Sequence, residues 1–437
     1  MKKTFTLLAA MALCASMQAE SLKILSLGLG TPGIDEPQLM GLGISPDGKY
    51  VCGPVEMGMG YFVGNIETNE YKFAMTDDDE GAELRHIDNN GLAIGYNGPG
   101  ITYSFATGEE TVLPVPDGDW KYVLGEALTN DGSTLVGSLV AKGYMTYAAY
   151  SCNGGEWTLL PMPSEEVLGR YAEDGSTAKY VSGDGKYILG SIGNNMGPAI
   201  LWVKNDAGEY EADPFYVNFV IMTEADLEAG EKTLLGLSPV NISNNGRYVL
   251  CSGTMESEDG YILVPVVYDT ESKTVKIYDE PQNVDMYGMG LYPSAIDDNG
   301  TFIGVIGQMP LYSSFGCFIM KAGATQAESL SEAFPEYGEV FGFSESIGCV
   351  VPTAMSADGS KMLAYGYYIE DPEDEDSWAY FATFVIDTNE GSSVESASSV
   401  AVPEAIYSID GQKLNSLKSG INIIRSSDGS VKKIIKK

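Results

Sequence analysis

One arrangement of apolar and polar positions recurs seven times along the chain. An apolar residue is followed in most copies by a small polar residue, one variable position, Asp or Asn, and Gly, and then by an alternating stretch that often closes on a second Gly. Asp-Gly and Asn-Gly suit a hairpin turn, because glycine adopts positive φ without a Cβ clash. The pattern therefore predicts a strand, a tight turn and a returning strand in each copy. The seven turn glycines are Gly48, Gly91, Gly132, Gly185, Gly246, Gly300 and Gly359.

The seven hairpins are spaced like the repeating units of one fold. Successive turn glycines lie 41 to 61 residues apart, and a second pair of apolar stretches follows each hairpin except the last. Units of four strands at this spacing are typical of a β-propeller. The last unit lacks its fourth strand, and we expect residues 22–27 to supply it by pairing with residues 379–387. The predicted fold is all-β: a seven-bladed β-propeller closed by an N-terminal strand and followed by a small C-terminal β module.

The order of the strands predicts which loops share a rim of the propeller. If the strands of a blade are named A to D, the A-to-B and C-to-D turns lie on one rim, and the B-to-C and blade-to-blade loops lie on the other. The second rim receives the long insertions, and loops on a rigid scaffold commonly carry binding residues. The insertions are residues 114–125, 161–179, 213–240, 279–294, 334–351 and 366–378.

Aromatic residues are frequent in these insertions. Such rings could stack on sugars or bury an aromatic peptide. In the alternative interpretation they pack the insertions onto the rim, because aromatic side chains bury the largest area per residue. The candidate binding residues are Trp120, Tyr171, Tyr216, Tyr287, Tyr292, Tyr337 and Trp378.

The N-terminus has the layout of a secretory signal peptide. Lys2 and Lys3 precede an apolar run over residues 5–17, and Ala19 ends a suitable cleavage site. The run is shorter than the roughly 20 residues that a membrane-spanning helix needs. We therefore expect residues 1–19 to be removed from a protein exported to the cell surface or the medium.

Composition indicates the remaining domain boundaries and argues against some classes of binding partner. Residues 20–390 would form the propeller, the small and polar residues 391–402 a linker, and residues 403–437 the C-terminal module. The formal net charge is −36, whereas residues 403–437 hold seven basic and three acidic side chains. An acidic body repels phosphate backbones and anionic headgroups, which argues against nucleic acid and membrane surfaces as partners. We expect a soluble monomer.

Few residues offer catalytic or metal chemistry. His86 is the only histidine, and a lone histidine is more often structural than catalytic. The acidic runs at residues 77–80 and 370–376 could supply paired carboxylates or weak Ca²⁺ ligands, although such runs are usually solvated loops. The scattered cysteines do not indicate a disulfide framework, and Cys52 and Cys251 are expected to fill apolar space in returning strands. Apart from weak Ca²⁺ binding, no cofactor is predicted.

The last 35 or so residues read as three short strands that carry a recognisable set of glycines. This tail, from about Pro403, resembles the C-terminal sorting domain of exported Bacteroidetes proteins that the type IX secretion machinery reads. The resemblance implies a contact with export machinery. It rests on Tyr407 and Gly411, Gly420 and Ile424, Gly429 and Lys433, and the terminal Lys437.

The hairpin copies that begin at Ile87 and Ile296 resemble the extracellular propeller repeats called HAF repeats. This resemblance implies a fold and a location, and no reaction. Three functions remain open. The first is a non-catalytic propeller that binds a glycan or a protein at the cell surface through its long-loop rim. The second is a carboxylate-based glycosidase or polysaccharide lyase on the same rim, and the third is a purely structural surface component.

Overall fold

A computed structural model describes most of the repeat region and parts of the C-terminal tail. The described residues are 22–25, 39–55, 58–76, 81–193, 197–213, 234–257, 260–279, 290–307, 316–341, 347–369, 379–388, 403–408, 413–414, 420–426 and 431–436. The chain divides into two compact units, Met1–Asn389 and Glu390–Lys437.

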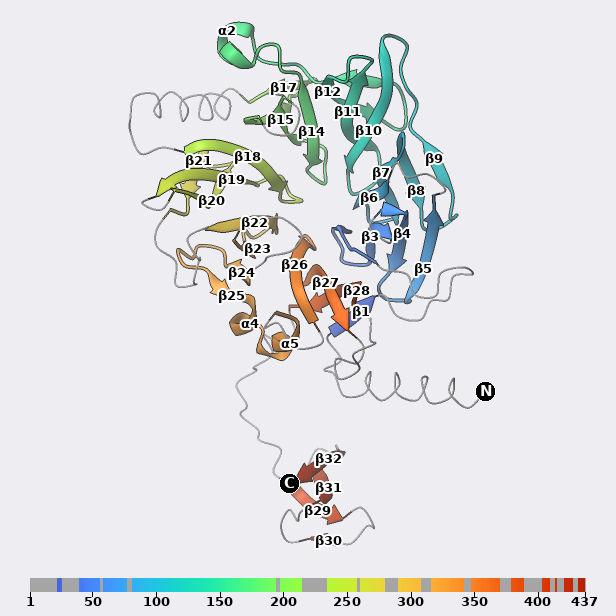
Figure 1. The fold of residues 1–437 in the computed structure, drawn as a ribbon, viewed down its shortest axis with the longest axis vertical. Coiled ribbons are helices and arrows are strands. Elements are labelled where there is room, and N and C mark those ends of the chain that lie inside the picture. The colour runs from blue at the N-terminus through green and yellow to red at the C-terminus, as the bar shows by residue number, and fades with distance from the viewer. Residues whose placement is uncertain are drawn as a thin grey trace. The chain divides into compact units, whose positions relative to one another are not determined.

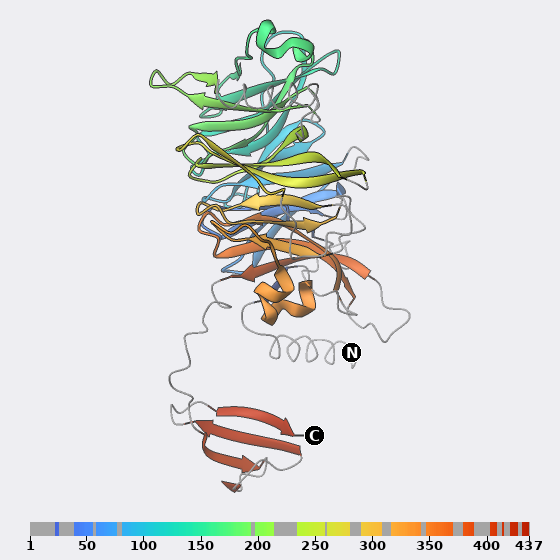
Figure 2. The same cartoon turned by 90° about the vertical axis from the view of Figure 1, so that its left-hand side faces the viewer.

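The first unit is a ring of seven four-stranded antiparallel sheets (Figure 1). Figure 2 shows the same ring from the side, with the strands running across the picture. Blades 1 to 3 consist of β2 (Gly43–Ile44), β3 (Tyr50–Val55), β4 (Gly60–Asn65) and β5 (Glu70–Met75); β6 (Ala82–Ile87), β7 (Leu92–Asn97), β8 (Gly100–Ser104) and β9 (Glu110–Val112); and β10 (Trp120–Leu128), β11 (Thr134–Ala141), β12 (Thr146–Cys152) and β13 (Trp157–Leu159).

Blades 4 to 7 repeat the arrangement. They consist of β14 (Ser176–Val181), β15 (Tyr187–Ile192), β16 (Ala199–Lys204) and β17 (Tyr210–Ala212); β18 (Leu234–Ile242), β19 (Tyr248–Ser257), β20 (Gly260–Asp269) and β21 (Thr274–Ile277); β22 (Leu291–Ile296), β23 (Phe302–Ile306), β24 (Cys317–Met320) and β25 (Glu328–Ser329); and β26 (Ile347–Met355), β27 (Lys361–Ile369), β28 (Ala379–Asp387) and β1 (Leu22–Leu25). Short helical segments are α2 (Glu165–Leu168), η2 (Gly169–Tyr171), α4 (Leu330–Ala333), η3 (Pro335–Tyr337) and α5 (Gly338–Phe341).

The ring closes by pairing the two ends of the repeat region. The strand β1 lies antiparallel to β28, with Ile24 opposite Phe384, and it completes blade 7 as its outermost strand. This pairing confirms the predicted closure. It covers a sheet edge that would otherwise expose unpaired backbone groups.

Apolar side chains fill the space between neighbouring blades. Seven clusters of buried residues each join two adjacent sheets, so that every blade packs on both of its faces. Cys52 belongs to the cluster between blades 1 and 2 and Cys251 to the one between blades 4 and 5, and both are buried thiols outside any disulfide. Two buried faces explain why the returning strands are apolar almost throughout.

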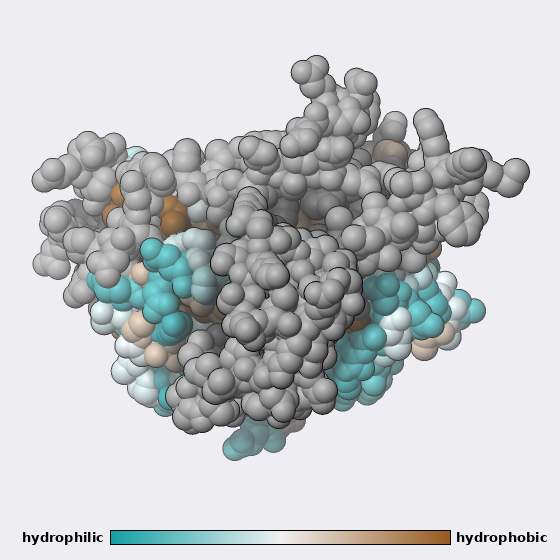
Figure 3. Space-filling view, turned by 90° about the horizontal axis from the view of Figure 1, so that it is seen from below, coloured by the Kyte–Doolittle hydropathy of each residue, from teal (hydrophilic) through white to brown (hydrophobic). Residues whose placement is uncertain are grey.

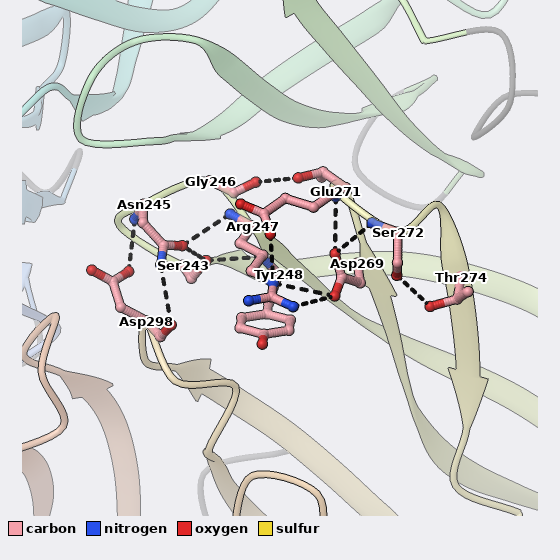
Figure 4. Close-up of polar contacts among 11 residues, drawn as sticks. Ser243, Asn245, Gly246, Arg247, Tyr248, Asp269, Glu271, Ser272, Thr274 and Asp298 are labelled. Carbon is pink, nitrogen blue, oxygen red and sulfur yellow. Dashed lines mark hydrogen bonds and ion pairs between the residues drawn. The ribbon is translucent and has the colours of Figure 1, made fainter.

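Five of the seven turns share one hydrogen-bond pattern, which Figure 4 shows for blade 5. Ser243 donates its hydroxyl to Asn245 Oδ1 (2.8 Å) and accepts from the amide of Tyr248 (2.9 Å). The amide of Gly246 donates to the Ser243 carbonyl (2.8 Å), and Gly246 has a φ of +73°. In blades 2 and 6 a buried Asp replaces the Ser or Thr and accepts from two amides with one oxygen. The small polar position of the repeat is therefore a buried acceptor that holds the turn.

The position between this acceptor and the Asp or Asn joins the blades into a ring. These residues, which we call the turn ring, are Pro46, Asn89, Asn130, Gly183, Asn244, Asp298 and Ala357. Backbone hydrogen bonds of 2.7 to 3.2 Å between them connect five of the seven junctions. At the other two, the amide of Asp47 donates to Asn89 Oδ1 (3.0 Å) and that of Asn245 donates to Asp298 Oδ1 (2.6 Å). Hydrogen bonds thus cross every junction at this rim.

The second unit contains one four-stranded sheet. Its strands lie in the order β30 (Lys413–Leu414), β29 (Pro403–Ser408), β31 (Gly420–Ser426) and β32 (Val431–Lys436). The predicted module thus has four strands where the sequence suggested three. Of the motif positions, Tyr407, Gly420, Ile424 and Lys433 lie on these strands, and Gly411, Gly429 and Lys437 lie outside the described residues.

One face of the described part is shown in Figure 3. On the face that Figure 3 shows, the coloured residues are mainly hydrophilic or neutral, and hydrophobic ones are few. None of the helices in the described segments has the length and apolar character needed to cross a membrane.

Candidate functional site

The first strand of each blade lines the central channel, and six of these strands carry the same irregularity. A β-bulge interrupts β6, β10, β14, β18, β22 and β26 six residues before the turn glycine. A bulge adds one residue to a strand and redirects its side chain. The residues at this position in all seven blades, which we call the bulge layer, are Leu42, Arg85, Glu126, Lys179, Val240, Ser294 and Thr353.

The second glycine of the repeat lies beside the bulge in blades 2, 3, 4 and 6. In blade 3, Gly137 lies opposite Gly125, next to the bulged residue. A Cβ on Gly137 would overlap the carbonyl oxygen of Leu124. The same conflict with a backbone carbonyl occurs at the closing glycines of blades 1, 2, 4 and 6. In blades 5 and 7 the equivalent register positions hold Cys251 and Ala364, two residues before the glycines that close those copies of the repeat.

The channel contains a cavity of about 420 Å³. All seven residues of the bulge layer line it, together with Glu83, His86 and Tyr180 and with turn-ring residues such as Asn130 and Asn244. This volume lies within the range of small-ligand pockets, which is roughly 300 to 1,000 Å³. The cavity is therefore the candidate binding site.

Charge is concentrated on one side of this cavity. Arg85 donates to Glu83 through Nε and to Glu126 through Nη1 (2.5 Å), and its guanidinium carbon lies 5.1 Å from the centre of the Tyr96 ring. Burial alone lowers the pKa of Arg85, but attraction to Glu126 and Glu83 outweighs it and raises the pKa. The guanidinium thus stays charged and bridges two blades, with Glu83 beside it on β6 and Glu126 on β10.

Lys179 lies in the same layer without a carboxylate in contact. The structure places no hydrogen-bond or ion-pair partner at Lys179 Nζ among the described residues, although Glu126 and Arg85 both act on it electrostatically. Burial lowers the pKa of this ammonium group, Glu126 opposes that effect and Arg85 adds to it. Lys179 is therefore a partly desolvated cation that faces the cavity.

Two further side chains complete this wall. Burial raises the pKa of the Tyr180 phenol, and the neighbouring Tyr292 and Glu126 add to the shift. The Nδ1 atom of His86 is buried and has no hydrogen-bond partner among the described residues. Burial lowers the pKa of His86 to about 4, so that the imidazole is neutral near pH 7.

The opposite wall is neutral. Blades 5 to 7 present Val240, Asn241, Ser294 and Thr353 to the cavity. Ser294 donates to the Ile303 carbonyl (3.2 Å). The site therefore offers charged groups of both signs on one side and uncharged polar groups on the other.

The predicted binding rings do not gather at this cavity. Trp120 opens β10 and packs edge-on against Tyr147, with ring centres 5.7 Å apart. Tyr171 lies partly buried in η2 against the cluster between blades 3 and 4. Tyr337 is only 1% exposed and donates its hydroxyl to the Asp387 carbonyl (3.0 Å), the placement of a packing residue.

Tyr292, on β22, is the predicted ring with an electrostatic effect on the cavity wall, through Tyr180. Tyr216, Tyr287 and Trp378 lie outside the described residues, as do the acidic runs 77–80 and 370–376. In the segments that the structure describes, no three His, Cys, Asp or Glu side chains are placed to hold a metal ion.

The charged residues of the cavity were not among the sequence candidates. A signal for them exists: when the seven copies are aligned on the turn glycine, the sixth position before it is charged in blades 2, 3 and 4 only. Arg85, Glu126 and Lys179 stand there inside strands that are otherwise mostly apolar. A charge on an inner strand must face either a partner or the channel.

No protein-family model matches the chain, and no curated protein matches it in sequence. The chain is similar to several solved structures. One is the β-propeller domain of Cps50 (Swd1) from Myceliophteria thermophila, at 10% identity and a TM-score of 0.46, over 80% of this chain and 96% of that chain.

Two others are TolB from Acinetobacter baumannii (10%, TM-score 0.37, 65% of this chain and 63% of that chain) and puromycin hydrolase (9%, TM-score 0.48, 88% and 58%). The fold is a seven-bladed β-propeller. These three proteins have different functions, and likeness at such identities concerns the fold alone.

Proposed function

We propose that this chain is a non-catalytic, exported binding protein that holds a glycan in its central channel. The observation that carries the proposal is the cavity of about 420 Å³ with charged groups on one wall and neutral polar groups on the other. Sugar hydroxyls both donate and accept hydrogen bonds, so they can pair with carboxylates and with cations alike. Tyr180 adds a ring to the same wall.

The turn ring supports this choice of site. Hydrogen bonds cross all seven junctions at that rim, which gives the cavity a rigid frame. From the order of the strands we expect the long insertions on the opposite rim, where they would contact the outer part of the ligand. A rigid, preformed site loses little conformational entropy on binding.

The rival function is carboxylate-based glycoside cleavage, because Glu83 and Glu126 both line the cavity. A glycosidase needs two carboxyl groups that face the scissile bond from opposite sides, one of them able to give up a proton. Here Arg85 lies between the two groups and donates to both. This arrangement favours binding over cleavage. If the full chain released reducing sugar from a glycan, and Glu83→Gln and Glu126→Gln each abolished the release, the rival would be preferred.

The binding test uses a variant that fills the channel. Ser294→Phe places a large ring in the cavity, and the matched control Ser272→Phe places the same ring at an exposed turn of blade 5. On a glycan array, the wild type and Ser272→Phe should bind the same sugars, and Ser294→Phe should lose them. Equal melting temperatures of the two variants would show that both are folded. An array with no binding by the wild type at high protein concentration contradicts the proposal.

We also propose that residues 403–437 direct export. The support is the glycine pattern of the tail together with its four-stranded sheet. Deletion of these residues should leave the protein inside the producing cell or its periplasm, and fractionation of cells that carry the full-length or the shortened gene measures this. Normal release of the shortened protein would rule the role out.

A further inference from the structure

We propose that the glycan bound in the channel is acidic, and that Lys179 binds its anionic group. This inference rests on the proposed function and adds the class of ligand. Its basis is a difference between the two cations of the bulge layer in their contacts with carboxylates.

Arg85 already has its partners. Glu83 and Glu126 both accept hydrogen bonds from its guanidinium, and the Tyr96 ring lies beside it. An incoming anion would have to compete with two carboxylates for these donors. Arg85 is therefore a structural bridge between blades 2 and 3.

Lys179 has none of these contacts. It lines the same cavity from blade 4, and no carboxylate of the described residues lies within ion-pair distance of its Nζ. An ammonium group that is partly removed from water keeps three donors to satisfy. An anion in the cavity would accept hydrogen bonds from this ammonium group in place of the water that burial removes. Such charge-assisted hydrogen bonds are stronger than neutral ones.

The net charge of the whole chain affects how an anion could bind beside Lys179. At a net charge of −36, the long-range field repels anions. An acidic sugar would therefore be held by a local contact, and Lys179 provides one with a single positive charge. Neutral polar groups of the opposite wall, such as Asn241, remain for the sugar hydroxyls.

The test compares matched sugars with matched variants of the full chain. The probes are disaccharides of glucose, of glucuronic acid, of glucosamine and of glucose 6-sulfate, measured by titration calorimetry at low and high salt. Lys179→Met keeps the length of the side chain and removes its charge, and Lys186→Met removes the charge of an exposed lysine in the same blade.

We expect the wild type to prefer an acidic disaccharide over the neutral one. The part of this preference that Lys179 adds, measured as the difference between the wild type and Lys179→Met, should weaken at high salt. Lys179→Met should lose about tenfold or more in affinity for the acidic sugar, keep its affinity for the neutral sugar, and melt no lower than the wild type. Lys186→Met should behave as the wild type does. Comparison of the glucuronate and sulfate probes identifies which anionic group is bound.

Three results would overturn the inference. Equal affinity of the wild type and Lys179→Met for the acidic sugar would show that the lysine does not bind it. Preference for the glucosamine disaccharide would show that Glu83 and Glu126 dominate the site. Binding of neutral sugars alone would refute the acidic ligand and leave the proposed function intact, whereas absence of all sugar binding would refute both.

Discussion

The turn ring and the bulge layer are two rings of seven residues, and they differ in what the blades have in common. In the turn ring the side chains differ, yet hydrogen bonds cross every junction and five of the seven are backbone to backbone. In the bulge layer the same β-bulge occurs in six blades, and the side chains range from leucine to arginine. The two rings lie four residues apart in each blade.

The difference between the two rings indicates at which positions the repeat must keep its residue type. Backbone geometry is demanded of every blade alike, so the residues that permit it recur: a buried acceptor before the turn, glycine in the turn, and in four blades a glycine opposite the bulge. A side chain that faces the channel has no counterpart to match in the next blade. The bulge layer is therefore free to carry charge on blades 2 to 4 and none on the others.

The strongest test of this comparison is a Cβ at the glycine opposite a bulge. In Gly137→Ala the new methyl group would overlap the Leu124 carbonyl, and we expect a loss of about 3 kcal/mol or failure to fold. Ala364→Gly is the control, because Ala364 occupies the same register in blade 7; it should cost about 1 kcal/mol. Urea unfolding measures both. A Gly137→Ala protein within 1 kcal/mol of the wild type would contradict this role of the bulge.

The second test concerns the charged wall. Arg85→Met leaves Glu83 and Glu126 without the cation between them, and we expect a loss of about 1 to 2 kcal/mol, less than for a fully buried pair because the Arg85 side chain is 36% exposed. Adding Glu83→Gln and Glu126→Gln should restore most of this stability, since it removes the two uncompensated charges. If the triple variant is no more stable than Arg85→Met, repulsion between the carboxylates is not the cause.

The third test applies to the turns. Ser243→Ala removes the hydroxyl that accepts from the Tyr248 amide and donates to Asn245 (Figure 4), and we expect a loss of about 1 kcal/mol. The control is Ser272→Ala, whose hydroxyl lies on an exposed turn of the same blade beside Thr274; its effect should be near zero. Thermal melts of the two variants decide whether the buried acceptor differs from an ordinary surface serine.

The fold could be predicted because its signals are residues that the backbone requires. The turn glycines gave the number of blades, and the missing strand after residue 387 led to the closure by β1. The site could not be predicted in this way. The bulge has no residue type of its own, because Arg85, Lys179 and Val240 share one position, and it follows from the backbone of two paired strands. Aromatic content drew attention to the long loops, whereas the cavity is lined by the first strands.

The turn ring illustrates the same limit. Its position is variable in sequence, with Pro46, Gly183 and Ala357 among its members, because it acts mainly through peptide groups that every residue has. The variability of this position in the sequence therefore gives no sign of the hydrogen bonds that its peptide groups make. Only the spatial arrangement of the turns shows that it joins the blades.

The last test concerns His86, the residue that follows Arg85 in the bulge layer's strand. Burial lowers the pKa of His86 to about 4 in the folded protein, against an ordinary value near 6.5 for an unfolded chain. Between these values the unfolded state binds more protons, so the free energy of unfolding falls as the pH falls.

His86→Asn removes this proton uptake. Because His86 is the only histidine, the wild type should lose roughly 0.8 kcal/mol relative to the variant between pH 7.5 and pH 6. Urea unfolding at the two pH values measures the difference. A wild type that loses no stability relative to the variant would mean that His86 is protonated as readily in the folded chain as in the unfolded one. The cavity wall at His86 would then be solvated rather than dry. At this residue the charged, desolvated wall would not differ in solvation from an ordinary protein surface.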